Sequence, residues 1–124
     1  MKGWRILGLA ALLLAACEDG APERNVTTVV AANPLSDQLK TLSGPSRDLG
    51  VYRAIRDNGR RCKRVEGAAY QEQYKTMAMW TAHCIDTGDW AVFIAPNGDV
   101  QVSPCKDART LGLPECRAQS APPA

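Results

Sequence analysis

The fold is decided by residues 90–102, which read WAVFIAPNGDVQV. An apolar run is followed by Asn97-Gly98, a dipeptide that tolerates the positive φ angles of a tight hairpin turn, and valines then return at alternate positions. With Asn97 and Gly98 as the loop pair, Phe93 faces Val102 across the hairpin. The opposite side of the first strand is also apolar, which is typical of a central strand. We therefore predict a hairpin whose first strand is central in the sheet and covered on both faces, on one of them by helices.

The segments around this hairpin complete a small sheet. Residues 77–85 alternate in polarity and predict a second strong strand, and residues 61–66 predict a shorter one. Residues 67–74, between these two strands, are polar and indicate a loop. Residues 104–116 also indicate a loop, with a cysteine near each end. The pattern predicts an antiparallel meander of three or four strands.

Two short amphipathic helices are predicted ahead of the strands. The first follows Asn33-Pro34, an N-cap residue with proline at the first helical position, and ends at Gly44. The second spans about 47–58, begins after the N-cap candidate Ser46, and stops at an Asn-Gly pair. Its apolar side covers about half of the helical wheel. That side holds Leu49, Val51, Tyr52 and Ile55.

These elements predict one small α+β domain, residues 34–116, in which two N-terminal helices precede the meander and disulfides staple the fold. The chain has 124 residues, of which 45% are hydrophobic and 23% charged, so it suits a single globular domain. Residues 17–33 predict a tether, because their small and acidic side chains have little to bury. Residues 117–124 predict a disordered tail.

The first residues have the pattern of an export signal. Lys2 and Arg5 precede residues 6–16, a small or apolar run that is too short for a bilayer, since a spanning helix needs about 20 residues. The run ends at 14–17 in the sequence LAAC. This leader resembles the lipobox of bacterial lipoproteins, with charge, apolar run, small residues and cysteine in the same order. The alternatives are an ordinary secretory peptide with a coincidental cysteine, or an uncleaved anchor.

The lipobox resemblance implies that residues 1–16 are a signal peptide and that Cys17 becomes the mature N-terminus, with diacylglycerol on its sulfur. Two or three acyl chains would anchor the protein firmly in a membrane, at about 0.8 kcal/mol for each buried CH₂. In such lipoproteins, Asp directly after the cysteine favours the inner membrane, whereas here Glu18 takes that place and Asp19 follows. We expect an envelope protein that faces the periplasm, slightly favouring the outer membrane. No cofactor other than the lipid is expected.

Four cysteines remain in the mature chain, and an even number in an exported protein predicts two disulfides. They are Cys62, Cys84, Cys105 and Cys116. The sequence allows three pairings, of which hairpin topology favours Cys62–Cys84 with Cys105–Cys116. Each bridge contributes about 3 kcal/mol in the chain-entropy view. No C-x-x-C spacing is present, so neither a metal site nor a redox centre is predicted.

The charges of the mature chain are unevenly distributed. Once the two cations of the leader are removed, 13 basic residues balance 13 acidic ones, yet residues 45–64 carry a net charge of +5. Arg53, Arg56 and Arg60 would lie close together on a continued helix. Such a cluster suits anionic lipid head groups or an acidic protein partner. The alternative is that these cations complement the helix C-terminus. Nucleic acid is not expected for a protein of the envelope.

Trp80 and Trp90 flank the turn at 85–89 and are a second candidate for partner binding, because Trp is favoured at interface hot spots. The alternative is that both pack in the core against a disulfide. His83 stands beside Cys84, but a Cys–His nucleophile needs a free thiolate, and this cysteine is expected to be paired. No catalytic residue is predicted, and we expect a protein without enzymatic activity.

Three stretches of the mature chain look like small uncharacterised lipoproteins of alphaproteobacteria. They are residues 60–65 (RRCKRV), 79–84 (MWTAHC) and 90–98 (WAVFIAPNG). The resemblance covers about residues 45–116 and implies no activity.

The function that we expect is therefore that of a membrane-anchored periplasmic lipoprotein, acting as a non-enzymatic binding or accessory module for an envelope protein partner. The alternative class is an inhibitor of a cell-wall-degrading enzyme such as lysozyme. Such an inhibitor would insert an acidic or serine side chain from a loop. The turn Asp86–Asp89 is the only candidate for that loop.

Overall fold

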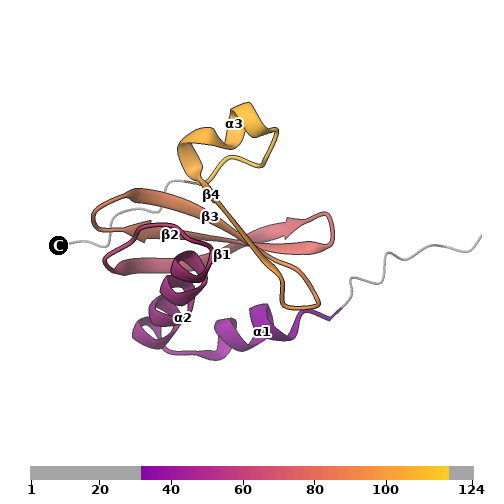
Figure 1. Ribbon diagram of the computed structural model, residues 1–124. Coiled ribbons are helices and arrows are strands. Elements are labelled where there is room, and N and C mark those ends of the chain that lie inside the picture. The colour runs from indigo at the N-terminus through magenta and orange to yellow at the C-terminus, as the bar shows by residue number, and fades with distance from the viewer. Residues whose placement is uncertain (1–31, 118–124) are drawn as a thin grey trace, which may run out of the picture.

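A four-stranded antiparallel sheet forms the middle layer of the protein, with two helices below it and a short C-terminal segment above it in Figure 1. The computed structural model describes residues 32–117. In chain order its elements are α1 (Pro34–Thr41), α2 (Gly44–Asp57), β1 (Val65–Tyr74), β2 (Met77–Cys84), β3 (Gly88–Ile94), β4 (Val100–Pro104), the 3₁₀ turn η1 (Cys105–Asp107) and α3 (Ala108–Leu111). The strands pair in the order β1-β2-β3-β4. The predicted α+β class and antiparallel meander are confirmed, and α3 is an additional helix.

Helix α1 begins where the sequence predicts and is fixed to the sheet by buried polar groups. The Asn33 side chain accepts a hydrogen bond from the Ser36 backbone N–H at 3.2 Å and donates one to the Ile94 carbonyl at 2.7 Å. The Ser36 hydroxyl in turn accepts from Trp80 Nε1 at 2.9 Å. Because buried polar groups are costly when unpaired, these bonds define one position for the helix on the sheet.

Helix α2 begins at Gly44, three residues before the predicted start at Arg47, and the helix position is corrected accordingly. Proline is favourable in a first helical turn, and Pro45 occupies that turn. The Arg47 side chain donates to the carbonyls of Leu39 at 3.0 Å and Leu42 at 2.9 Å, which satisfies the open end of α1. A Cβ at Gly50 would lie 2.9 Å from a Leu39 methyl, so a larger residue at this position would displace the Leu39 side chain where the two helices meet.

Helix α2 ends as predicted, at an Asn-Gly pair. Gly59 has a φ of 74° and donates its N–H to the Arg56 carbonyl at 2.9 Å, while the Arg60 N–H reaches the Ile55 carbonyl at 3.2 Å. Together these two bonds form a Schellman ending. The chain leaves the helix axis at this point, so the continued helix that was expected to carry Arg60 does not form.

Strand β1 corrects the prediction most strongly, because residues 67–74, predicted as a loop, form most of it. The strand predicted over 61–66 contributes only its last two residues, from Val65. The register of β1 shifts twice, between Glu66 and Ala69 and again between Tyr70 and Glu72. Such bulges interrupt the alternation by which a strand is recognised in sequence. β1 is also an edge strand, where polar residues are common on both faces.

The β3–β4 hairpin has a loop of three residues in place of the predicted two. The Gly98 N–H donates to the Ala95 carbonyl at 2.9 Å, and the Ala95 N–H donates to the Asp99 carbonyl at 2.8 Å. Pro96 restricts its own φ to about −65°, which suits a type I turn, and Gly98 then takes the left-handed position with a φ of 92°.

The longer loop shifts the register of this hairpin by one residue. The predicted pairing of Phe93 with Val102 is wrong: Phe93 lies opposite Gln101, and Val102 lies opposite Val92. Because side chains alternate along a strand, the valines of β4 join the helix-facing side, and Phe93 points to the other face.

Both favoured disulfide pairs are present in the structure. Cys62 bonds to Cys84, and Cys105 bonds to Cys116, with a Cα–Cα distance of 5.6 Å in each pair. The first pair is buried in the core beside the helices, whereas the second is partly exposed. It closes residues 105–117 over the sheet, and we call these residues the C-terminal strap.

The two faces of the sheet carry cores of different size. The helix-facing core is the larger, and its buried members include Val51, Ile55, Val65, Trp80, Trp90, Val92 and Ile94. The strap-facing core consists of Met79, Ala91 and Phe93, against which the strap packs its Leu113 and its disulfide. Strand β3 is buried on both faces, as expected for a central strand.

Candidate functional site

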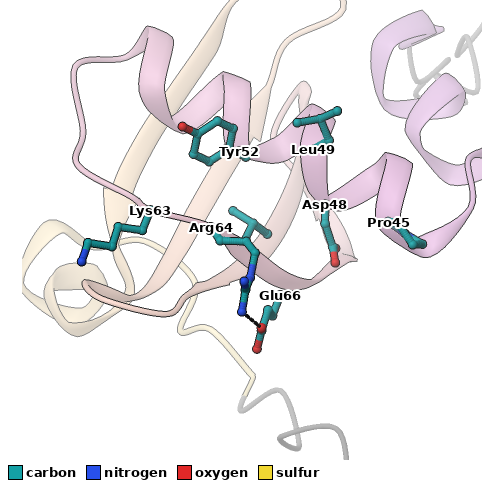
Figure 2. A pocket seen from close by; sticks show the side chains of 8 residues that line it. Pro45, Asp48, Leu49, Tyr52, Lys63, Arg64 and Glu66 are labelled. Atoms are coloured by element: carbon teal, nitrogen blue, oxygen red, sulfur yellow. Dashed lines mark hydrogen bonds and ion pairs between the residues drawn. The ribbon is translucent and has the colours of Figure 1, made fainter.

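A groove of about 550 Å³ runs between α2 and the segment that leads into β1. Figure 2 shows its helical residues following one another along α2, with the residues of the other wall on the segment facing them. The lining residues are Pro45, Asp48, Leu49, Tyr52, Lys63, Arg64, Val65 and Glu66. One helical flank and four consecutive residues therefore build the groove.

The apolar part of the groove comes from the edge of the apolar side of α2. Leu49 is 48% exposed and Tyr52 is half-buried, while Val65 is buried at the base. The helical wheel predicts Leu49 on the core-facing side with Val51 and Ile55, yet only the latter two are fully buried. The apolar side of α2 is therefore wider than the part that the sheet covers, and the uncovered residues, Leu49 and Tyr52, line the groove.

Asp48 positions the start of β1 against the helix. Its two carboxylate oxygens accept hydrogen bonds from the backbone N–H groups of Gly67, at 3.3 Å, and Ala68, at 2.8 Å. Both donors lie in the first register shift of β1, where they are not part of the strand pairing. The Asp48 charge is therefore engaged by backbone donors within the fold.

The facing wall of the groove is charged. Arg64 pairs with Glu66 at 2.7 Å, and the pair lies across the groove from Asp48 in Figure 2. Lys63 is exposed, and its backbone N–H donates to the Asp86 carboxylate at 2.9 Å. Among residues 32–117, the Lys63 ammonium has no ion-pair partner within 4 Å. The Lys63 side chain extends away from Leu49 and Tyr52 in Figure 2, so this cation lies at the outer end of the wall.

The predicted arginine cluster is only partly assembled. Arg53 and Arg56 are exposed on α2. Arg56 follows Tyr52 by one turn, so it extends the groove-facing flank of the helix. Arg60 lies beyond the helix end, with its guanidinium 5.7 Å from the centre of the Trp90 ring. Arg56 therefore continues the helical flank beyond the lining residues, while Arg60 packs on an aromatic side chain.

Trp80 and Trp90 are not a partner-binding surface, and that prediction is corrected. Trp80 is 1% exposed and Trp90 is 7% exposed. The Trp90 indole N–H donates to the Thr87 hydroxyl at 3.0 Å, as that of Trp80 does to a serine of α1. Both rings lie on the helix-facing side of the sheet, which the helices cover. The alternative interpretation, core packing beside a disulfide, is the observed one.

The acidic turn between β2 and β3 serves the fold. Asp86 holds the backbone of Lys63, and Asp89 contacts His83 Nδ1 at 2.6 Å across the two strands. These carboxylates already have partners within the protein, so the structure gives no support to the turn as an inhibitory loop. Within residues 32–117, no group of three or more His, Cys, Asp or Glu side chains is placed to hold a metal ion.

Two other hollows include polar and charged residues that pair with one another. The first, of about 340 Å³ between α1 and β1, has Lys40 placed 4.0 Å from the centre of the Tyr70 ring. The second, of about 520 Å³ beside the strap, includes Arg109, which pairs with Glu115 at 2.7 Å, and Arg117, which pairs with a glutamate of β1. The α2–β1 groove differs from both in its apolar floor.

No family model, curated protein or solved structure matches this chain. Cys17, the predicted signal peptide, most of the predicted tether and the residues after 117 lie outside the described residues. Among the helices of residues 32–117, none combines the length and the apolar character needed to cross a membrane. Any functional assignment therefore depends on the leader sequence and on the geometry of the groove.

Proposed function

We propose that this protein is a membrane-anchored periplasmic lipoprotein, attached through lipid on Cys17, and that it acts as a non-enzymatic binding or accessory module for an envelope protein partner. We further propose that the partner binds in the α2–β1 groove. The observation that carries the proposal is the exposure of Leu49, at 48%, beside a half-buried Tyr52 in a concave site.

The groove supports binding better than a scattered apolar residue would. Single exposed leucines are ordinary on protein surfaces. Here, however, Leu49 borders a hollow that Tyr52 also lines and that has the buried Val65 at its base. Charged residues surround this hollow. Apolar pockets with a polar rim are the usual form of binding sites. The disulfide Cys62–Cys84 holds the facing wall, so the groove is formed before a partner arrives.

The anchor and the segment after it fit the same role. Fully extended, residues 17–33 would span at most about 60 Å, which lets a lipid-anchored domain search the space near a membrane. Holding both partners at one surface raises the effective concentration, so that a groove of modest affinity suffices.

The test is a photo-crosslinking experiment in the native host, with a benzoyl-phenylalanine side chain placed at Leu49. The matched control places the same group at Leu111, which is 58% exposed on α3, on the other side of the sheet. We expect a defined adduct from position 49 and none from position 111. We also expect that Cys17→Ser releases the protein from the membrane fraction and lowers the yield of the adduct.

Three outcomes would contradict the proposal. Equal adducts from both positions would show non-specific contact, and no adduct from position 49 would remove the groove as the binding site. Retention of the Cys17→Ser variant in the membrane fraction, with an unchanged mass, would remove the lipid anchor. Circular dichroism spectra of the purified variants confirm that each change leaves the fold intact.

A further inference from the structure

Building on the proposed function, we infer that the α2–β1 groove accepts an acidic, extended peptide segment of the partner, with one apolar side chain seated between Leu49 and Tyr52 and its carboxylates facing Lys63 and Arg56. The segment would lie along α2, in the direction in which Pro45, Asp48, Leu49 and Tyr52 follow one another (Figure 2).

The apolar part of the groove sets the first requirement on the occupant. Leu49 and Tyr52 are one helical step of three residues apart, so their side chains neighbour each other on the same flank of α2. The buried Val65 closes the base between the helix and the facing wall. This space suits a single aliphatic or aromatic side chain, and a small inorganic anion would leave it unfilled.

The charges around the groove set the second requirement. Its two acidic residues are already engaged, Asp48 by the backbone N–H groups at the start of β1 and Glu66 by Arg64 at 2.7 Å. The cations Lys63 and Arg56 have no ion-pair partner within 4 Å among residues 32–117. Asp48 is bonded by neutral donors and keeps its charge, so the four charged lining residues sum to zero. The excess positive charge comes from the exposed arginines that flank the lining residues along the chain, Arg53, Arg56 and Arg61, and the complementary occupant is acidic.

The surrounding sequence extends this positive field beyond the groove. Residues 45–64 carry a net charge of +5, and Arg53 and Arg61 are also exposed. Such a field accelerates the encounter with an acidic partner, and salt weakens it.

The shape of the site favours a peptide over a membrane surface. The apolar residues lie in a hollow between a helix and a facing segment, whereas a bilayer is broad and meets protruding side chains. An extended peptide can enter such a hollow and offer alternate side chains to its floor and rim.

The test uses fluorescence anisotropy with labelled peptides and the mature chain carrying Cys17→Ser. The probe is the peptide EEELEEE, and its controls are EEESEEE, which lacks the apolar side chain, and KKKLKKK, which reverses the charge. At 50 mM salt we expect EEELEEE to bind about fivefold more tightly than EEESEEE, KKKLKKK not to bind, and 500 mM salt to weaken the complex at least fivefold.

Variants locate the binding on the protein. Lys63→Glu should weaken the binding of EEELEEE about tenfold, and Leu49→Ser about fivefold, whereas Lys106→Glu on the strap makes the same charge change and should alter it less than twofold. All three residues are exposed, so these variants are expected to fold, and thermal unfolding checks this.

The inference is overturned if EEESEEE binds as tightly as EEELEEE, if Lys63→Glu and Lys106→Glu have equal effects, or if phosphatidylglycerol vesicles compete better than the acidic peptide. The photo-crosslinking experiment separates the two proposals. A specific adduct from position 49 without peptide binding removes the acidic peptide and keeps the groove, whereas loss of the adduct removes both.

Discussion

The two faces of the sheet are covered in different ways. The helix-facing side has two helices over a core of thirteen buried residues, and buried hydrogen bonds fix α1 upon it. The strap-facing side has three buried residues, covered by a short segment that crosses from β4 back to β1. The first layer is stabilised mainly by apolar burial. The second depends on a disulfide and on polar contacts.

Gln71 on β1 receives most of those polar contacts. Its amide donates to the Glu115 carbonyl at 3.0 Å and accepts from the Arg117 N–H at 2.9 Å, while its own carbonyl accepts from the Arg117 side chain at 3.3 Å. The strap is therefore closed on itself by Cys105–Cys116, and its C-terminal end is held on β1 by this glutamine. The difference between the faces predicts that the helices unfold with the whole domain, whereas the strap can open alone.

The largest effect should come from the helix-facing side. Ile55→Ala removes a side chain with 0% exposure and should lower the free energy of unfolding by about 4 kcal/mol, because a cavity remains where the helix meets the sheet. Urea unfolding followed by circular dichroism measures the loss, with Leu111→Ala on the exposed α3 as the control that should change little. Partial unfolding of α2 alone, with a native sheet, would contradict the comparison.

The strap disulfide should give a smaller and more local effect. Replacing Cys105 and Cys116 by serine removes a constraint worth about 3 kcal/mol in the chain-entropy view. We expect fast amide hydrogen exchange in residues 105–117 and nearly unchanged exchange in β2 and β3. The Cys62→Ser/Cys84→Ser variant provides the contrast, since these cysteines are buried beside the helices and exchange should rise throughout the domain. Equal exchange patterns in the two variants would show that the faces do not differ.

The smallest effect should come from the polar end of the strap. Gln71→Ala should cost about 1 kcal/mol and raise hydrogen exchange near Arg117, because several hydrogen bonds are lost at a partly exposed site. Gln73→Ala is the matched control on the same strand. Its amide contacts only the carbonyl of Lys75, at 3.2 Å, among the described residues. If both variants behave alike, Gln71 is not an anchor of the strap.

Much of the fold follows from local sequence signals. The Asn33-Pro34 start of α1, the Asn-Gly stop of α2 and both disulfide pairs are as predicted. Strand β1 could not be predicted in this way, because its bulges conceal the alternation and its edge position permits polar residues. The hairpin register was predicted wrongly because Pro96 was not counted in the loop. Its fixed φ suits a type I turn, which makes a loop of three residues instead of two.

The candidate site was predictable only in part. The basic character of residues 45–64 is visible in the sequence, and Arg53 and Arg56 are exposed on α2, close along the chain to the lining residue Tyr52. Trp80 and Trp90 were misleading because aromatic residues signal core and interface equally, and burial decides between them. The sequence signal for the groove was the width of the apolar side of α2. This side is wider than the core can cover, so Leu49 stays outside the core.

Asp48 has a consequence for the solubility of the protein. β1 is an edge strand, and unpaired N–H groups on an edge can recruit a strand from another molecule and start aggregation. By accepting hydrogen bonds from Gly67 and Ala68, the Asp48 carboxylate occupies two of those donors and places a negative charge beside them. The residue that joins the helix to the sheet thereby also leaves fewer donors free at this end of the edge strand.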